Sequence, residues 1–282
     1  MRRLTDFDGY IFDLDGTIYL GERLIDGARE TVLGLRAAGK RVVFLSNKPL
    51  ETREDYARKL TRLGIPTPAE EVINSSWVMA RWLSSRAPGA TVYVIGEPPL
   101  LDELRRAGLT VLEDPTGRYE QVQYVIAAFD RTFDYRKLDH ALQAIRRGAR
   151  FVATNADRTC PVEGGEIPDA AGVIGAIEGV TGKQVEAVTG KPSPIMVETV
   201  LSHLGLAAEA CLMVGDRLET DMLMGLRAGM GTALVLTGVT RPEHLPHPEI
   251  RPHFVLESVG AIADALSASP PGFHSRPRCR PS

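Results

Sequence analysis

Short apolar runs alternate with helical segments through most of this chain. The runs at Tyr10–Phe12, Val42–Leu45 and Cys211–Val214 have the length and composition of buried strands. The segments 27–38 and 51–63 have the character of helices, and a glycine closes each of them. Regular alternation of strands and helices favours parallel strands joined by crossover helices. We therefore predict an α/β fold with a Rossmann-like, doubly wound parallel sheet as its core.

A second alternating unit interrupts this core between Asn47 and Lys191. Pro88-Gly89 is a turn signal that marks its start, and Thr181-Gly182-Lys183 marks its end. Within it the pattern predicts strands at 91–95, 122–128 and 151–154, and helices at 99–107 and 136–147. We predict an inserted α/β cap domain.

The resulting domain prediction has four segments. They are a first core segment at 1–88, the cap at 89–182, a second core segment at 183–268 and a tail at 269–282. In the second core segment, Ser193 is placed to cap a helix that begins at Pro194. Further elements are expected as a helix at 75–85, a helix at 220–228 and a strand at 232–236. The tail is rich in proline and arginine and is expected to be disordered.

Acidic residues stand at the ends of two predicted strands. Asp13 and Asp15 follow the first apolar run two positions apart, so their side chains leave on the same side. Asp13 is placed to attack phosphorus as a nucleophile and form a phosphoaspartate. Asp15 is placed to protonate the leaving oxygen and then take a proton from water. An Asp-x-Asp triplet is also common in solvated loops; the preceding strand and the following Gly16-Thr17 favour the catalytic interpretation.

Three further positions supply groups that suit a phosphate. Ser46 and Asn47 follow the second apolar run, where a hydroxyl and backbone amides can hold phosphate oxygens; capping of the next helix is the alternative. Lys191, which we expect to open a helix, can balance the charge of phosphate and carboxylates. An isolated lysine is otherwise a solvated surface group.

A magnesium ion is the expected cofactor. Mg²⁺ prefers octahedral oxygen ligands, and the carboxylates of Asp13 and Asp216 with the Asp15 backbone carbonyl would supply three of them. Asp221 follows Asp216 by about one helical turn and is placed to orient water or Lys191. For Asp221, an acid favoured by a helix N-terminus is the alternative.

Composition limits the classes of partner. The formal net charge of −3 gives no reason to expect nucleic acid as a partner. The three cysteines, Cys160, Cys211 and Cys279, are far apart and have no zinc spacing, as expected for reduced thiols in a cytoplasmic protein. Aspartates interrupt the N-terminal segment, so no signal peptide is predicted. No apolar run approaches the length of a membrane span, so none is predicted.

The four motifs together resemble the haloacid dehalogenase (HAD) superfamily of phosphatases. They are Asp13–Thr17, Ser46-Asn47, Lys191-Pro192 and Gly215-Asp216, in this order. The inserted α/β cap is similar to the type II cap. Segments 43–47, 153–157 and 167–177 look most like the branch of arabinose-operon sugar phosphatases and p-nitrophenyl phosphatases. Many relatives have a second Asn where this chain has Lys48, a Pro at Ala156 and, in the pyridoxal-phosphate branch, a His at Cys160.

By this resemblance the expected function is a Mg²⁺-dependent phosphomonoesterase acting on a small phosphorylated metabolite such as a sugar or glycerol phosphate. The resemblance also allows a homodimer formed through the cap. Two alternatives remain: a phosphomutase or phosphotransferase on the same fold, and a non-catalytic receiver-type module that signals through phospho-Asp. The inserted cap argues against the receiver. Release of free phosphate would distinguish a phosphomonoesterase from a phosphomutase or phosphotransferase.

Overall fold

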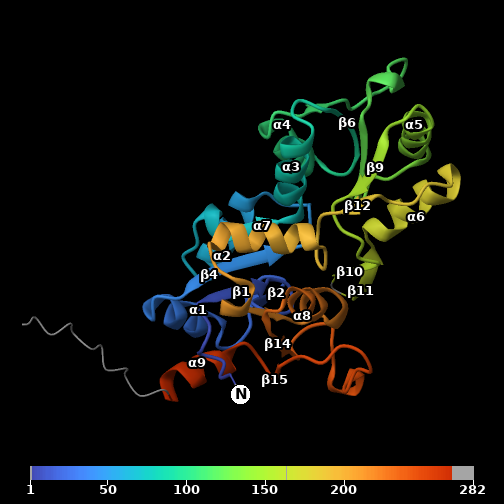
Figure 1. Ribbon diagram of the computed structural model, residues 1–282. Coiled ribbons are helices and arrows are strands. Elements are labelled where there is room, and N and C mark those ends of the chain that lie inside the picture. The colour runs from blue at the N-terminus through green and yellow to red at the C-terminus, as the bar shows by residue number, and fades with distance from the viewer. Residues whose placement is uncertain (1, 163, 269–282) are drawn as a thin grey trace, which may run out of the picture.

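The computed structural model describes residues 2–162 and 164–268; the tail predicted to be disordered, 269–282, lies outside them. Within the described residues the chain forms two α/β units, each built on a parallel sheet, and the second unit stands above the first in Figure 1. The described part of the chain contains no helix with the length and apolar character needed to cross a membrane.

The larger sheet has six strands, and all neighbouring pairs are parallel. From edge to edge they are β15 (Phe254–Leu256), β14 (Gly231–Val235), β13 (Cys211–Gly215), β1 (Gly9–Asp13), β4 (Arg41–Ser46) and β5 (Val72–Asn74). The chain runs from β1 outward through β4 and β5, and later returns on the other side of β1 through β13. Ligands bind at such a reversal of strand order, beyond the carboxyl ends of the strands. The predicted doubly wound fold is confirmed.

Helices cover both faces of this sheet (Figure 1). One face carries α1, α2 and α9, and the other carries α3, α7 and α8. Their bounds are α1 (Ala28–Ala37), α2 (Arg53–Arg62), α3 (Ser75–Arg86), α7 (Pro194–Leu204), α8 (Leu223–Ala228) and α9 (Gly260–Ala268). Because both faces are covered, the central strands are continuous apolar runs rather than alternating ones.

Local signals set the helix starts. At α2, the Thr52 hydroxyl accepts a hydrogen bond from the Asp55 amide and the Asp55 carboxylate accepts one from the Thr52 amide, so the helix starts two residues later than predicted. At α7, Ser193 caps a helix whose first residue is Pro194, as predicted. The expectation that Lys191 opens this helix is wrong, because the cap places Lys191 in the preceding loop.

The smaller sheet has five parallel strands. In spatial order they are β12 (Ala187–Val188), β9 (Arg150–Ala153), β8 (Tyr124–Ala127), β6 (Thr91–Ile95) and β7 (Thr110–Val111). Helices α5 (Tyr135–Arg146) and α6 (Ala170–Thr181) pack on one face, and α3 and α4 (Pro98–Arg106) on the other. The edge strand β12 lies beyond residue 182, where the pattern placed the return to the core, because a two-residue strand leaves no periodicity to read.

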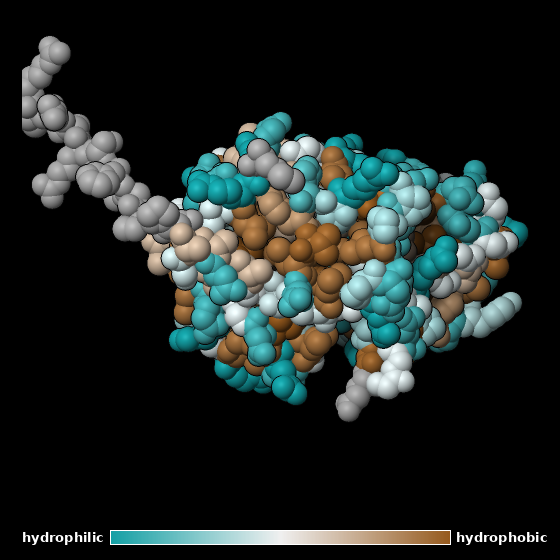
Figure 2. Space-filling model, turned by 90° about the horizontal axis from the view of Figure 1, so that it is seen from below, coloured by the Kyte–Doolittle hydropathy of each residue, from teal (hydrophilic) through white to brown (hydrophobic). Residues whose placement is uncertain are grey.

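Two antiparallel hairpins complete the fold. One consists of β2 (Tyr19–Leu20) and β3 (Arg23–Leu24), directly after β1, and the other of β10 (Thr159–Val162) and β11 (Gly165–Pro168). Figure 1 shows β10 and β11 reaching down from the smaller unit toward the larger sheet. Seen from below, the face of the larger unit carries apolar groups across its middle with hydrophilic groups around them (Figure 2).

Candidate active site

Three carboxylates meet at the carboxyl edge of the larger sheet. Asp13 ends β1, Asp216 directly follows β13, and Asp221 lies on a π-helical turn, Leu218–Met222, that leads into α8. All three are buried, and one oxygen atom from each lies within 4.8 Å of the others. Strand β1 pairs with β13 in parallel, which brings the ends of the two strands together. The π-helical turn replaces the first part of the helix predicted at 220–228, and π-turns are frequent at functional sites.

The Lys191 ammonium group joins these acids. Its Nζ atom lies 2.5 Å from Asp13 Oδ1 and 2.6 Å from Asp221 Oδ1, and the residue is only 4% exposed. Burial favours the neutral amine, but the two carboxylates outweigh it and raise the pKa of Lys191 above its ordinary value. The lysine is therefore charged and compensates part of the negative charge of the cluster.

The remaining acceptors of the cluster fit a divalent cation. Asp216 Oδ2 accepts a hydrogen bond from the Val239 amide at 2.6 Å, whereas Asp216 Oδ1 is buried without a hydrogen-bond partner among the described residues. Burial, and then the neighbouring Asp221, raise the pKa of Asp216 to about 6. A buried carboxylate oxygen without a partner is unfavourable, and hard cations such as Mg²⁺ take oxygen ligands. Asp13 and Asp216 therefore suit Mg²⁺.

Asp221 is engaged through both oxygen atoms. Its Oδ1 atom accepts from Lys191, and its Oδ2 atom accepts from the Arg217 amide at 3.1 Å. These contacts favour a role in orienting Lys191. Asp13 differs, because Lys191 engages its Oδ1 atom. Burial raises the pKa of Asp13 well above its ordinary value, and the charge of Lys191 counters part of that rise.

Glycines allow two loops to approach Asp216. A Cβ atom on Gly238 would lie 2.0 Å from Asp216 Oδ2, and one on Gly16 would lie 2.7 Å from the same atom. Gly16 also has a φ of +87°, which side chains rarely adopt. The turn after β1 and the loop after β14 thus close around the carboxylate because both residues lack a side chain.

Asp15 lies at the same edge but outside the buried cluster. Its side chain is 32% exposed and lines a small cavity together with Asp13. Its Oδ2 atom lies 3.2 Å from the ammonium of Lys48. In the sequence, Lys48 stands out only as a departure from relatives, and nothing in the pattern indicates that its side chain turns toward Asp15.

Ser46 and Asn47 both line this cavity, as their position at the end of β4 predicts. The Ser46 hydroxyl donates to the Tyr56 hydroxyl at 3.2 Å and accepts from the Lys48 amide at 3.2 Å. The Asn47 side chain accepts from the Lys191 amide at 2.8 Å and donates to the Lys191 carbonyl at 3.2 Å. Asn47 therefore fixes the backbone that carries Lys191.

The smaller unit lines one side of the cavity, whose volume is about 40 Å³. The hairpin contributes Thr159, Cys160 and Pro161 to its lining. Just before the hairpin, Asp157 Oδ2 accepts from Asn47 Nδ2 at 2.8 Å, and Asp157 Oδ1 lies 3.7 Å from Arg217. Sequence patterns give no role to these residues, because the contacts that define them join segments far apart in the chain.

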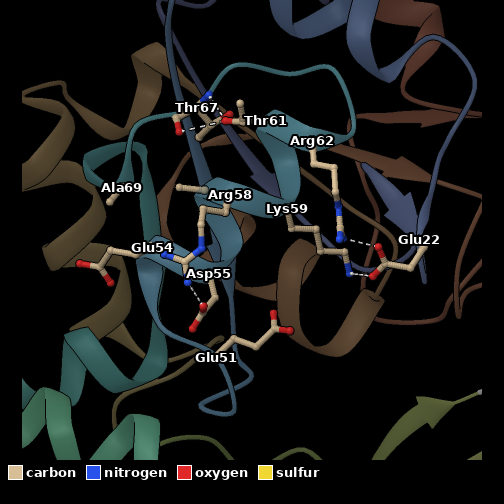
Figure 3. A pocket seen from close by; sticks show the side chains of 11 residues that line it. Glu22, Glu51, Glu54, Asp55, Arg58, Lys59, Thr61, Arg62, Thr67 and Ala69 are labelled. Carbon is tan, nitrogen blue, oxygen red and sulfur yellow. Dashed lines mark hydrogen bonds and ion pairs between the residues drawn. The ribbon is translucent and has the colours of Figure 1, made fainter.

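A larger hollow of about 760 Å³ lies elsewhere, along α2 and the β2–β3 turn (Figure 3). Several of its charged groups pair with one another: Glu22 binds Arg62 and lies 3.5 Å from Lys59, and Asp55 binds Arg58. It contains none of the clustered acids, so size alone does not identify the reactive site.

Two family models match the chain. The first, described as haloacid dehalogenase-like hydrolase, covers residues 10–110, and the second, HAD-hydrolase-like, covers residues 188–262. Among curated proteins, the chain is 40% identical over 251 residues to the sugar-phosphatase AraL of Bacillus subtilis, with 89% of this chain and 90% of that protein covered. It is 37% identical over 279 residues to phosphoglycolate phosphatase 1A of Arabidopsis thaliana, with 92% and 76% covered.

Solved structures match over nearly their whole length. The p-nitrophenyl phosphatase from Archaeoglobus fulgidus superposes with a TM-score of 0.86 at 34% identity, covering 92% of this chain and 99% of that one. The 4-nitrophenylphosphatase from Thermotoga maritima gives a TM-score of 0.87 at 35% identity, covering 93% and 98%. Similarity therefore extends through both α/β units.

Proposed function

Because this chain belongs to the haloacid dehalogenase-like hydrolases and is a phosphatase, we propose that it is a Mg²⁺-dependent phosphomonoesterase that acts through a phosphoaspartate. The observation that carries the proposal is the buried cluster of Asp13, Asp216 and Asp221, in which Lys191 pairs with Asp13 and Asp221. Anionic groups alone would repel a phosphate. The charge of Lys191 and the fit of the cluster to a divalent cation reverse that repulsion.

Asp13 is the proposed nucleophile. Lys191 holds its Oδ1 atom, which leaves Oδ2 as the atom that attacks phosphorus in line with the leaving oxygen. The new Oδ2–P bond forms as the bond from phosphorus to the leaving oxygen breaks. Mg²⁺, held by Asp13, Asp216 and the Asp15 backbone carbonyl, would neutralise charge on the phosphoryl oxygens.

Asp15 is the proposed acid and base. It lines the cavity beside Asp13 but stays partly exposed, so it can exchange protons with the solvent. It gives its proton to the leaving oxygen in the first step and takes one from water in the second, when that water releases phosphate from Asp13. Ser46 and the amides around Asn47 are proposed to hold the phosphate oxygens.

The unit above the site is proposed to act as a cap that selects small substrates. With the hairpin in place the cavity measures about 40 Å³, so the cap has to open for entry, and a protein substrate has no room. Sugar and glycerol phosphates belong to this class of small esters. The names of two relatives, a sugar-phosphatase and a phosphoglycolate phosphatase, support small phosphate esters as the substrate class.

Phosphate release from a panel of phosphorylated metabolites and p-nitrophenyl phosphate, with Mg²⁺ and with excess chelator, tests the proposal. We expect release of free phosphate that chelator abolishes reversibly. A phosphomutase would instead transfer the phosphoryl group to a second sugar without releasing it. Full activity in excess chelator would contradict the metal-dependent mechanism.

The compartment of the protein is proposed from its cysteines, and its oligomeric state from the family resemblance. The described cysteines, Cys160 and Cys211, are free and buried, which suits a cytoplasmic protein with reduced thiols; Cys279 lies outside the described residues. A homodimer formed through the cap is proposed from the family resemblance. Light scattering of the intact protein and of a variant with charges added to the cap surface tests it.

A further inference from the structure

Lys48 occupies a position in the cavity that the proposed mechanism does not use. It follows Asn47 in the loop after β4, and its ammonium group lies 3.2 Å from Asp15 Oδ2. The Cys160 thiol of the cap hairpin is its other side-chain partner. The lysine side chain is 25% exposed and lines the cavity together with Asp13 and Lys191. It therefore stands where the core meets the cap.

The other two cations of the cavity have different surroundings. Lys191 is held by two carboxylates, Asp13 and Asp221, on the side of the proposed metal ligands. Arg217 faces Asp157 of the cap at 3.7 Å. Lys48 has a single carboxylate and a weakly accepting thiol for the three donor hydrogens of its ammonium group. Its ammonium group can therefore donate a hydrogen bond to an anionic group of a molecule bound in the cavity.

The distance to the reacting atoms limits what that partner can be. A leaving oxygen that takes a proton from Asp15 lies within hydrogen-bond distance of its carboxyl group. Since Lys48 is 3.2 Å from Asp15 Oδ2, the ammonium lies within about 6 Å of a leaving oxygen bonded to Oδ2, and within about 8 Å of one bonded to Oδ1. A carboxylate carried by the ester carbon, or by the next carbon, spans this gap with a hydrogen bond to Lys48.

We propose that Lys48 makes this phosphatase prefer phosphate esters of short hydroxy acids over esters of neutral alcohols and polyols. The proposal rests on the proposed function, because it takes Asp15 as the donor to the leaving oxygen. The cavity of about 40 Å³ under the hairpin supports a short alcohol. A polyol would offer hydroxyl groups to Lys48 but would bring no charge to balance the ammonium.

The test compares two substrates that differ in one group. 2-Phosphoglycolate carries a carboxylate where 2-hydroxyethyl phosphate carries a hydroxymethyl group. We expect the wild type to have a kcat/KM about tenfold or more higher for the carboxylated ester, the range of a hydrogen bond to a charged group. Lys48→Met should remove most of that ratio, and Lys48→Arg should keep it. Lys183→Met, which removes an exposed cap lysine away from the cavity, is the matched control and should leave the ratio unchanged.

The readout is the ratio of kcat/KM for the two substrates. Lys48 also contacts Asp15, so its loss can slow both reactions alike without changing this ratio. Turnover of p-nitrophenyl phosphate by the wild type separates the proposed function from the role of Lys48. If the wild type does not hydrolyse it, the proposed function fails. If the wild type hydrolyses p-nitrophenyl phosphate but prefers the neutral ester, only the role of Lys48 is overturned. The same holds if Lys48→Met keeps the wild-type ratio. Should Lys48→Met not fold, the wild-type ratio and Lys48→Arg decide.

Discussion

The ammonium of Lys191 lies 2.5 Å from Asp13 Oδ1, although the two residues are 178 positions apart in the chain. Asp13 ends the central strand, and Lys191 sits in the loop that returns from the smaller sheet. Asn47 holds that loop through both hydrogen-bonding groups of the Lys191 backbone. The proposed nucleophile and its cation are therefore positioned by three separate segments of the chain.

Lys191→Met should weaken both activity and stability. The variant leaves Asp13 and Asp221 buried without their cation, and breaking such a buried pair costs about 3–5 kcal/mol. We expect kcat to fall about a hundredfold or more, as when a single charge-stabilising donor is removed from an active site. Steady-state kinetics and urea unfolding measure the two effects. Lys183→Met, exposed on the cap, is the control; a Lys191→Met enzyme with normal kcat would refute the proposed charge compensation.

Asp13→Asn and Asp15→Asn should fail in different ways. An amide at 13 cannot form the acyl phosphate, so no turnover of any substrate is expected. Asp15→Asn keeps the nucleophile but loses the proton carrier, which blocks esters with basic leaving groups. The p-nitrophenolate anion leaves without a proton, so the first step survives on p-nitrophenyl phosphate while hydrolysis of the phosphoaspartate lacks its base.

Rapid mixing of the Asp15→Asn variant with p-nitrophenyl phosphate should therefore show a burst of p-nitrophenolate followed by slow steady release. Asp13→Asn should show neither phase. Equal loss on both classes of substrate without a burst would mean that Asp15 holds structure or metal rather than protons.

The contribution of Asp216 to the stability of the metal-free protein should fall as the pH rises from about 4 to 6. Burial raises the pKa of Asp216 from 3.8 to about 6 in the folded protein, so in this window the folded state binds more protons than the unfolded state. The stabilising contribution of this group is present below pH 3.8 and is lost as the pH rises through 6; its full size is about 3 kcal/mol. Urea unfolding in chelator across this range measures how stability depends on pH, and Asp216→Asn should lack this falling contribution. Equal slopes in both proteins would contradict the assignment.

The strands that carry the acids are predictable from the sequence because their surroundings are simple. Both faces of β1, β4 and β13 are covered, so each is a continuous apolar run, and the polar residue that ends the run must lie at the edge of the sheet. That is why the sequence alone places Asp13, Ser46 and Asp216 at this edge. Strands of two or three residues, such as β12, escape prediction because they are defined by their pairing and not by their own pattern.

The surroundings of the acids cannot be read in the same way. The pattern places Asn47 beside phosphate, whereas its side chain is engaged with the Lys191 backbone and with Asp157, which is 110 positions away. Likewise, no local feature indicates that Lys48 turns toward Asp15 and the cap. Such contacts depend on how the inserted unit packs on the core, and a single sequence carries no periodic signal for that packing.

Gly238→Ala should impair metal binding more than folding. The new Cβ would lie 2.0 Å from Asp216 Oδ2, so the carboxylate or the loop has to shift. We expect Mg²⁺ to support activity only at concentrations at least tenfold higher than for the wild type, because the ligand is displaced. Gly175→Ala is the control, since a Cβ there meets nothing within 4 Å and alanine favours the helix. A Mg²⁺ titration of activity measures the effect, and an unchanged midpoint would show that the loop relaxes without cost.

Asp157→Asn should loosen the closed arrangement of the two units. Asp157 accepts from Asn47 at 2.8 Å and faces Arg217 at 3.7 Å, so a cap residue binds two core residues that flank the site. Asparagine has nearly the same shape but no charge. Its amide oxygen can face only one of the two donors, Asn47 or Arg217, and its NH2 group then faces the other. Closure should therefore become less favourable, and KM should rise several-fold for small phosphate esters.

The unfolding midpoint should change little, because each unit keeps its own apolar core. Asp139→Asn, at a partly exposed position of α5, controls for the loss of one charge on the cap. The split between KM and kcat decides the interpretation, since the chemical step uses none of the altered contacts once the cap is closed. A fall in kcat with an unchanged KM would instead place Asp157 among the groups that position Lys191 through Asn47.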